Sequence, residues 1–132
     1  IEKVVQDFIK YSMKRKMIAN SNKVLILGAT FKENCPDVRN SKVFDFIDEF
    51  DRYGIEVKIY DPVAVYAEEA TKYQKSIDYE LNSSDYIGII LAVAHNEFIE
   101  LGVNKIKSLA PENALFFDLK GCFELHQSDL RM

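Results

Sequence analysis

A run of four apolar residues, Val24-Leu25-Ile26-Leu27, constrains the fold of this chain more than any other feature of the sequence. The run ends at Gly28 and does not alternate with polar residues, which is typical of a strand that is buried on both faces. Such strands occur in parallel sheets, where helices cover both faces. The sequence therefore predicts an α/β domain with a mostly parallel sheet.

The segments after this strand follow the order expected of a doubly wound sheet. Ser41 can cap a helix that ends at Gly54, and residues 55–60 form the next strand, which completes a unit with the length of a βαβ crossover. The pattern predicts further strands near Ile77 and over 86–93 and 115–119, and further helices over 1–20, 63–73 and within 95–109, with a helical turn that ends at Asp85. Together these elements predict a three-layer, doubly wound, Rossmann-like domain.

Residues 1–20 carry an apolar stripe at helical spacing, with basic side chains mostly outside it. The chain begins at Ile1 and enters this pattern at once, which suggests a piece of a longer protein. We therefore expect residues 1–22 to be a linker helix that follows an upstream region, and residues 23–132 to form the domain. The stripe consists of Val4, Val5, Phe8, Ile9, Met13 and Met17.

Composition excludes several classes of protein. The length of 132 residues is typical of one domain. The net charge is -4 and the sequence has no long basic run, so we do not expect the chain to bind nucleic acid. No apolar run reaches the roughly 18 residues that span a bilayer, and no signal peptide is evident. Cys35 and Cys122 lack the spacing of a zinc site or a disulfide framework, so we expect reduced thiols, no metal and a cytoplasmic protein.

Polar residues follow the carboxyl ends of the predicted strands, where open α/β sheets bind ligands. The segment 28–41 is long for a loop after a first strand. Its Lys32 and Arg39 place positive charge beside a helix amino terminus, which favours a phosphate, and Phe31 could lie against a base or sugar. Solvated lysine and arginine side chains, with Phe31 as a plug over the sheet edge, are an equally good interpretation. The other polar residues at this edge are Thr30, Asp61, His95, Asn96 and Lys120.

Three short motifs carry a resemblance to a known family. Residues 28–34 are G-A-T-F-K-E-N, residues 37–41 are D-V-R-N-S, and residues 60–62 are Y-D-P. They closely resemble the GxTFKxN, DxRNS and YDP motifs in the carboxy-terminal domain of the UDP-glucose/GDP-mannose dehydrogenase family. The resemblance runs in register from about Lys23 to the last predicted strand, and the first helix resembles the stretch that joins the family's central region to this domain.

The resemblance implies a UDP-sugar 6-dehydrogenase of three parts, with NAD bound by an amino-terminal domain and the catalytic cysteine in a central region that joins two subunits. This chain resembles the third part, which closes over the UDP-sugar, and it contains no catalytic residue. The sugar's C6 hydroxyl is oxidised to a carboxylate while two NAD are reduced. By the family pattern, Phe31 and Lys32 contact the UDP portion of the substrate and Arg39 reaches the NAD pyrophosphate. The complete enzyme is expected to be a homo-oligomer.

The roles of several residues in and near the motifs have more than one interpretation. Cys35 matches no role in the family. His95 lies in A-V-A-H-N-E-F, which resembles the branch that oxidises UDP-2-acetamido sugars, and it either contacts substrate or bonds to nearby backbone at a helix start. Lys120 could contact a phosphate or be solvated. The remaining motif residues, which could hold the loop's shape, are Thr30, Asp37, Asn40 and Ser41.

Two other functions fit the residues. The chain could be a free-standing nucleotide-binding or regulatory α/β module without catalysis. It could also be a self-sufficient NAD domain in which Asp61 binds a ribose. The second requires a G-x-G-x-x-G fingerprint, and the loop after the first strand has one glycine where that fingerprint has three, so Asp61 is better explained as a helix cap.

Overall fold

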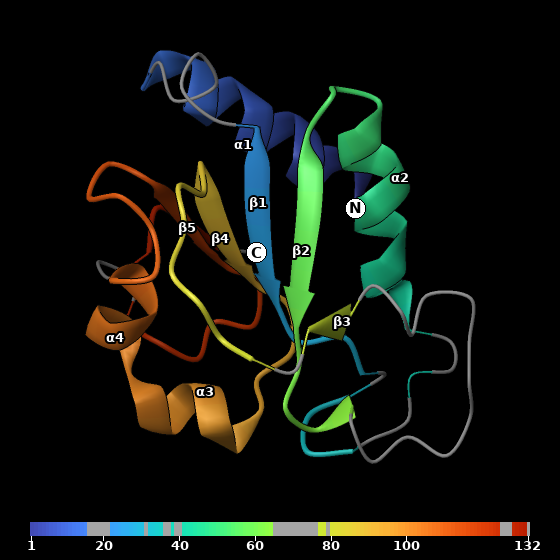
Figure 1. Ribbon diagram of the computed structural model, residues 1–132, viewed down its shortest axis with the longest axis vertical. Helices are drawn as coiled ribbons and strands as arrows, with labels where there is room; N and C mark the ends of the chain where they lie inside the picture. The colour runs from blue at the N-terminus through green and yellow to red at the C-terminus, as the bar shows by residue number, and fades with distance from the viewer. Residues whose placement is uncertain are drawn as a thin grey trace.

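In the part of the chain that the structure describes, six parallel strands form one sheet in the order β3-β2-β1-β4-β5-β6 (Figure 1). This is the strand order of a doubly wound Rossmann sheet, and it reverses between β1 and β4. The computed structural model describes residues 1–15, 22–30, 32–35, 38, 41–64, 77–78, 80–124 and 128–131. The strands are β1 (Lys23–Leu27), β2 (Glu56–Tyr60), β3 (Ile77–Asp78), β4 (Gly88–Leu91), β5 (Leu115–Asp118) and β6 (Leu130–Arg131).

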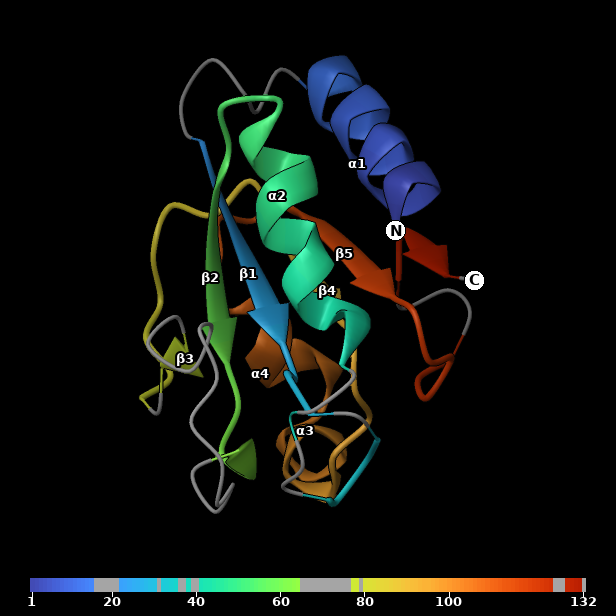
Figure 2. The same ribbon diagram turned by 90° about the vertical axis from the view of Figure 1, so that its right-hand side faces the viewer.

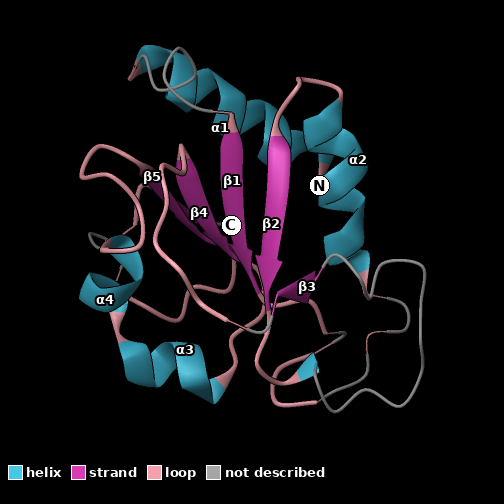
Figure 3. Ribbon diagram, in the orientation of Figure 1, coloured by secondary structure: helices cyan, strands magenta, loops and turns pink. Residues whose placement is uncertain are grey.

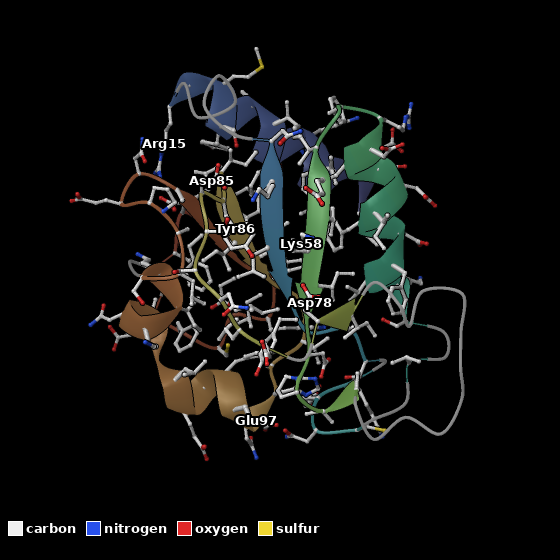
Figure 4. All side chains as sticks on the ribbon, viewed as in Figure 1. Arg15, Lys58, Asp78, Asp85, Tyr86 and Glu97 are labelled. Carbon is white, nitrogen blue, oxygen red and sulfur yellow. The ribbon has the colours of Figure 1, made fainter. Side chains whose placement is uncertain are left out.

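Helices lie on both faces of the sheet, which gives the three layers that the sequence predicts (Figures 2 and 3). One face carries α1 (Glu2–Lys14) and the continuous pair of the 3₁₀ turn η1 (Lys42–Phe44) and α2 (Asp45–Asp51). The other face carries α3 (Asn96–Leu101) and α4 (Val103–Lys107). The predicted three-layer, doubly wound α/β class is therefore confirmed.

The central strand explains why its sequence is apolar throughout. Successive side chains of a strand point to opposite faces. Val24 and Ile26 belong to the core between the sheet and α1 and α2, whereas Leu25 and Leu27 belong to the core on the α3 and α4 side. Both faces are covered, so a polar residue at any of these positions would be buried without a partner.

Helix α1 is anchored to the sheet by Phe8. Its buried ring lies 5.4 Å from the ring of Phe50 and 5.1 Å from that of Phe117, measured between centroids. The ring also lies against β4 at Gly88, where an added Cβ would be 2.4 Å from Cζ of Phe8. The predicted stripe is wrong at Met13, which is 65% exposed, because Ser12 lies one helical turn after Phe8 and takes the buried position.

Several element boundaries also match the sequence pattern. Ser41 caps η1 by accepting a hydrogen bond from the Val43 N–H (3.4 Å), and Gly54 ends the α2 segment with a φ of 72°. The short strand near Ile77 is present as β3. The helix predicted over 63–73 falls mostly outside the described residues.

Two predictions about the later part of the chain are wrong. No helical turn ends at Asp85, because that carboxylate pairs with Lys23 (3.2 Å) and the Ser84 N–H donates to the Leu109 carbonyl (3.0 Å). The strand at 115–119 is not the last, since β6 pairs with β5 through Phe117 and Leu130. None of the helices in the described ranges has the length and apolar character that a membrane span requires.

Candidate functional site

The chain turns sharply where β1 and β4 end, at the point where the strand order reverses. Gly28 leaves β1 with a φ of 103° and passes against Val93, so that a Cβ on residue 28 would lie 2.5 Å from the Cβ of Val93. Only glycine combines this backbone angle with this close approach. The crossing directs Thr30 and the following loop to the carboxyl edge of the sheet.

A cleft of about 480 Å³ opens at this edge, which we call the switch-point cleft. Its walls come from the segments after β1, β4 and β5, from η1 and α2, and from the first turn of α1. The floor is apolar, with Val93 and Phe46 among the residues that line it, whereas the charged residues are three lysines and one glutamate. These charged residues are Lys32, Lys42, Lys120 and Glu33.

The excess of lysine makes the cleft suited to an anion. Three lysines among the lining residues raise the local concentration of a phosphate-bearing ligand and can donate charge-assisted hydrogen bonds to it. The apolar floor can accommodate the base or the sugar ring of the same ligand. The cleft therefore has the composition expected of a nucleotide site.

Behind the cleft wall lies a buried polar cluster centred on Asp61, which directly follows β2. One carboxylate oxygen, Oδ1, accepts hydrogen bonds from the N–H groups of Val63 (2.7 Å) and Ala64 (2.9 Å). The other, Oδ2, accepts from the Ala29 N–H (2.6 Å) and lies 2.9 Å from Nε2 of His95. The bonds to Val63 and Ala64 have the geometry expected of a cap, although the helix predicted after them falls mostly outside the described residues. The same carboxylate also joins the ends of β1, β2 and β4.

Hydrogen bonding keeps Asp61 ionised despite its burial. The side chain is completely buried, and desolvation raises its pKa. Hydrogen bonds from His95, Ala29 and Ala64 outweigh this effect, so the pKa of Asp61 lies below its ordinary value of 3.8. At neutral pH the cluster therefore contains a carboxylate that can only accept hydrogen bonds.

The hydrogen bonds of His95 identify its tautomer. Nδ1 accepts a hydrogen bond from the Asn34 N–H (2.9 Å), so Nδ1 carries no proton. Nε2 faces the Asp61 carboxylate, which can only accept, so Nε2 carries the proton. The imidazole is therefore neutral, and its contact with Asp61 is a hydrogen bond rather than an ion pair.

The same imidazole reaches the first loop at two points. Besides Asn34, Oγ1 of Thr30 lies 3.2 Å from Nε2 of His95 and donates its own proton to the Lys32 carbonyl (2.9 Å). Asn34 adopts a φ of 59°, a left-handed conformation that asparagine tolerates. Its Oδ1 accepts a hydrogen bond from the Asn96 N–H (2.9 Å) at the start of α3. These bonds connect the loop after β1 to the amino end of α3, which lies on the face of the sheet opposite α1 and α2.

The sequence-predicted site residues fall into four groups. Lys32 and Lys120 line the switch-point cleft. Thr30 is buried and also lines the cleft, whereas the buried His95 is not one of its lining residues. The His95 side chain accepts a hydrogen bond from Asn34, a residue distant in sequence, while its main-chain carbonyl accepts from the N–H groups of Phe98 and Ile99. Cys35 is a free thiol, and the Cys122 thiol lies 3.8 Å from Oδ1 of Asp118. The remaining predicted residues, Phe31, Asp37, Arg39 and Asn40, lie outside the described residues.

Two residues that support the site were given no role by the sequence. Asn34 was part of the motif, and its preference for left-handed turns is the signal that could have identified it. Asp118 is buried at the end of β5 and accepts hydrogen bonds from the N–H groups of Lys120 (3.2 Å) and Phe123 (3.0 Å). This carboxylate shapes the turn that carries Lys120 into the cleft. Within the described ranges, no cluster of three His, Cys, Asp or Glu side chains could hold a metal ion.

Comparison with known proteins gives the same family as the loop motifs. Residues 25–125 match the model of the UDP-glucose/GDP-mannose dehydrogenase family, UDP binding domain. The chain is 38% identical to a UDP-N-acetyl-D-glucosamine 6-dehydrogenase of Pseudomonas aeruginosa and 36% identical to one of Salmonella typhi, with 98% of the chain covered in each case. It spans only 31% and 30% of the length of these two relatives.

Solved structures of low sequence identity share the fold. A UDP-D-ManNAc dehydrogenase from Pyrococcus horikoshii superposes with a TM-score of 0.64 at 19% identity, and covers 98% of this chain and 30% of its own. A GDP-mannose dehydrogenase from Pseudomonas aeruginosa gives a TM-score of 0.61 at 21% identity, over 95% of this chain and 31% of its own. At these identities the likeness supports the Rossmann-like fold alone.

Proposed function

Because the chain belongs to the UDP-glucose/GDP-mannose dehydrogenase family, we propose that it is the part of a UDP-sugar 6-dehydrogenase that binds the nucleotide sugar. The observation that carries this proposal is the switch-point cleft, which combines three lysines with an apolar floor inside the region that matches the family's UDP binding domain. The cleft binds the UDP portion, with Lys32 donating to the pyrophosphate and Phe31 packing against the nucleoside. Lys120 lines the same cleft and is a second candidate for a phosphate contact.

The substrate we propose is a UDP-N-acetylhexosamine. The two relatives that are 38% and 36% identical are UDP-N-acetyl-D-glucosamine 6-dehydrogenases, and they align with nearly the whole chain. In the complete protein the C6 hydroxyl is oxidised to a carboxylate. This is a four-electron oxidation that consumes one water and reduces two NAD.

The residues that follow β1 and β2 do not suit the way in which a Rossmann domain binds NAD. Asp61, where a ribose-binding acid would stand, is completely buried, and both of its oxygens accept hydrogen bonds from the protein itself. The loop after β1 also lacks the glycines that let a pyrophosphate approach the backbone. These two observations argue against a self-sufficient NAD domain. We propose that another part of the complete protein binds NAD and that Arg39 of this chain reaches its pyrophosphate, on the strength of the motif match.

The remaining proposals concern the complete protein. We propose that residues 1–22, which include α1, link the UDP-sugar domain of residues 23–132 to the rest of the complete protein, and that the catalytic cysteine lies outside this chain. The complete protein is a cytoplasmic homo-oligomer. The sequence encoded upstream of Ile1 tests this organisation, which requires a G-x-G-x-x-G near its start and a cysteine in a glycine-rich stretch before α1.

Binding of UDP-N-acetylglucosamine to the complete protein tests the proposed site. Titration calorimetry should give a dissociation constant that rises by about tenfold in Lys32→Ala, since a hydrogen bond to a charged group contributes roughly 1.5 kcal/mol or more. Lys105→Ala is the matched control, because Lys105 is exposed on α4, on the other face of the sheet. Equal affinity in both variants would place the nucleotide elsewhere. Absence of NADH formation with every UDP-hexose tried would refute the activity.

A further inference from the structure

We propose that His95 is a positioning residue for the nucleotide-sugar site, and that it acts by fixing the loop that carries Lys32. This inference rests on the proposed function. His95 is completely buried and lies behind the cleft wall, so it acts through its neighbours rather than by contact with the ligand. The residues through which it acts are Thr30 and Asn34.

Lys32 lies between two residues that contact the same imidazole. On one side, Thr30 is within hydrogen-bond distance of Nε2 of His95 and holds the Lys32 carbonyl through its hydroxyl. On the other side, the Asn34 N–H donates to Nδ1. The backbone of Lys32 is therefore fixed at both flanks, although its side chain is exposed. A loop held in this way loses less entropy when the lysine engages a phosphate.

Asp61 determines which nitrogen of the His95 imidazole carries the proton. The carboxylate holds the proton on Nε2, which leaves a lone pair on Nδ1 for the Asn34 N–H. Asn34 is held a second time, because its Oδ1 accepts from the Asn96 N–H. The loop is thereby clamped between the carboxylate after β2 and the start of α3.

Capping of α3 does not explain the imidazole at this position. The His95 side chain makes no capping hydrogen bond to α3, although His95 is the residue before that helix. Its ring packs 5.6 Å from the ring of Phe98, measured between centroids, a neighbour that a phenylalanine could also contact. A buried polar ring is costly without partners. Its polar bonds reach the loop and Asp61, so its specific contribution is to the loop.

The test compares His95→Phe and His95→Gln in the complete protein with UDP-N-acetylglucosamine as ligand. His95→Phe keeps a buried aromatic ring, somewhat larger than imidazole, and loses the polar contacts with Thr30, Asn34 and Asp61. The KM and the dissociation constant for the UDP-sugar should therefore rise by about tenfold, while the KM for NAD stays unchanged. His95→Gln presents an amide donor and a carbonyl acceptor, so it should recover part of the affinity. A structural role alone would lower thermal stability without separating the two KM values.

A milder variant guards against misfolding of the buried substitutions. Asn34→Gly tolerates the positive φ and leaves Asp61 and His95 in place, while it removes the side-chain bond to Asn96. We expect weaker UDP-sugar binding at nearly unchanged melting temperature. Amide exchange at residue 34 should also accelerate in His95→Phe and stay unchanged in Lys32→Ala.

The outcomes separate the two proposals. If the unmodified protein binds no UDP-sugar, the proposed function fails. If it binds, but folded His95→Phe and Asn34→Gly bind equally well, the positioning role of His95 is wrong and the function stands.

Discussion

Gly28 and Val93 are in contact where the first and fourth strands end, and the contact leaves no room for a side chain on residue 28. An added Cβ would lie 2.5 Å from the Cβ of Val93 and 2.8 Å from its backbone nitrogen. Real Cβ atoms do not approach backbone atoms so closely. The path of the loop into the cleft therefore depends on the absence of one methyl group.

Gly28→Ala should be severely destabilising. The substitution forces alanine into a φ of 103° and creates the clash with Val93, so we expect a loss of at least about 2 kcal/mol in the free energy of unfolding. Gly54→Ala is the matched control, because its φ is 72° and an added Cβ meets nothing within 4 Å. It should cost about 1 kcal/mol. Urea denaturation measures both, and equal losses would show that the clash is relieved.

Phe8→Ala should remove much of the attachment of α1. The ring is completely buried among aromatic rings and against Gly88, and truncation of such a side chain costs about 3–5 kcal/mol. Met13→Ala, on the exposed face of the same helix, should change the free energy of unfolding by less than about 0.5 kcal/mol. Denaturation followed by circular dichroism distinguishes them. Similar values for the two variants would mean that α1 does not pack on the sheet.

Acidification should destabilise the domain through Asp61. Its pKa is lower in the folded state than the ordinary 3.8, so the stabilisation is complete above the unfolded pKa and is lost as pH falls through the folded value. Melting temperatures between neutral pH and pH of about 3 should fall steeply at the acid end. Asp61→Asn should be less stable at neutral pH and show a shallower acid limb, whereas Asp51→Asn, at an exposed position, should keep the original profile. An unchanged acid limb in Asp61→Asn would contradict the assignment.

Binding of the UDP-sugar should weaken as salt increases. Three lysines surround the cleft, and attraction between exposed charges is screened over a Debye length of about 10 Å at 0.1 M salt. Lys120→Ala should lower both the affinity and its dependence on salt. A titration series at rising sodium chloride concentration measures the slope. An unchanged slope in Lys120→Ala would remove that lysine from the site.

The sequence was sufficient for the fold where local pattern and burial agree. Val24 to Leu27 indicated a doubly covered strand, and Gly54 and Ser41 marked the ends of the next helix, because each of these signals depends on neighbouring residues only. Strand β6 gave no such signal. Its place depends on Asp129, whose carboxylate accepts hydrogen bonds from the Phe116 N–H (2.7 Å) and from Arg15 (2.5 Å), and neither partner is near in sequence.

The sequence likewise predicted only those parts of the site that depend on neighbouring residues. The position of Lys32 at the carboxyl edge follows from its place after β1, and the hydrogen bonds that Asp61 accepts from the N–H groups of Val63 and Ala64 follow from the residues beside it. The bond between Asn34 and His95 joins two loops that only the finished sheet brings together. No spacing along the chain encodes it, and the tautomer that it requires depends on Asp61, from a third segment.

The central position of β1 has a consequence for how the chain is made. Both of its neighbours, β2 and β4, come later in the sequence, so an apolar strand emerges from the ribosome with two open edges. Parallel pairings close long loops and form slowly, and open strand edges invite aggregation. We therefore expect nascent chains that stop before β4 to bind chaperones through residues 24–27, the segment that later becomes the most protected part of the domain.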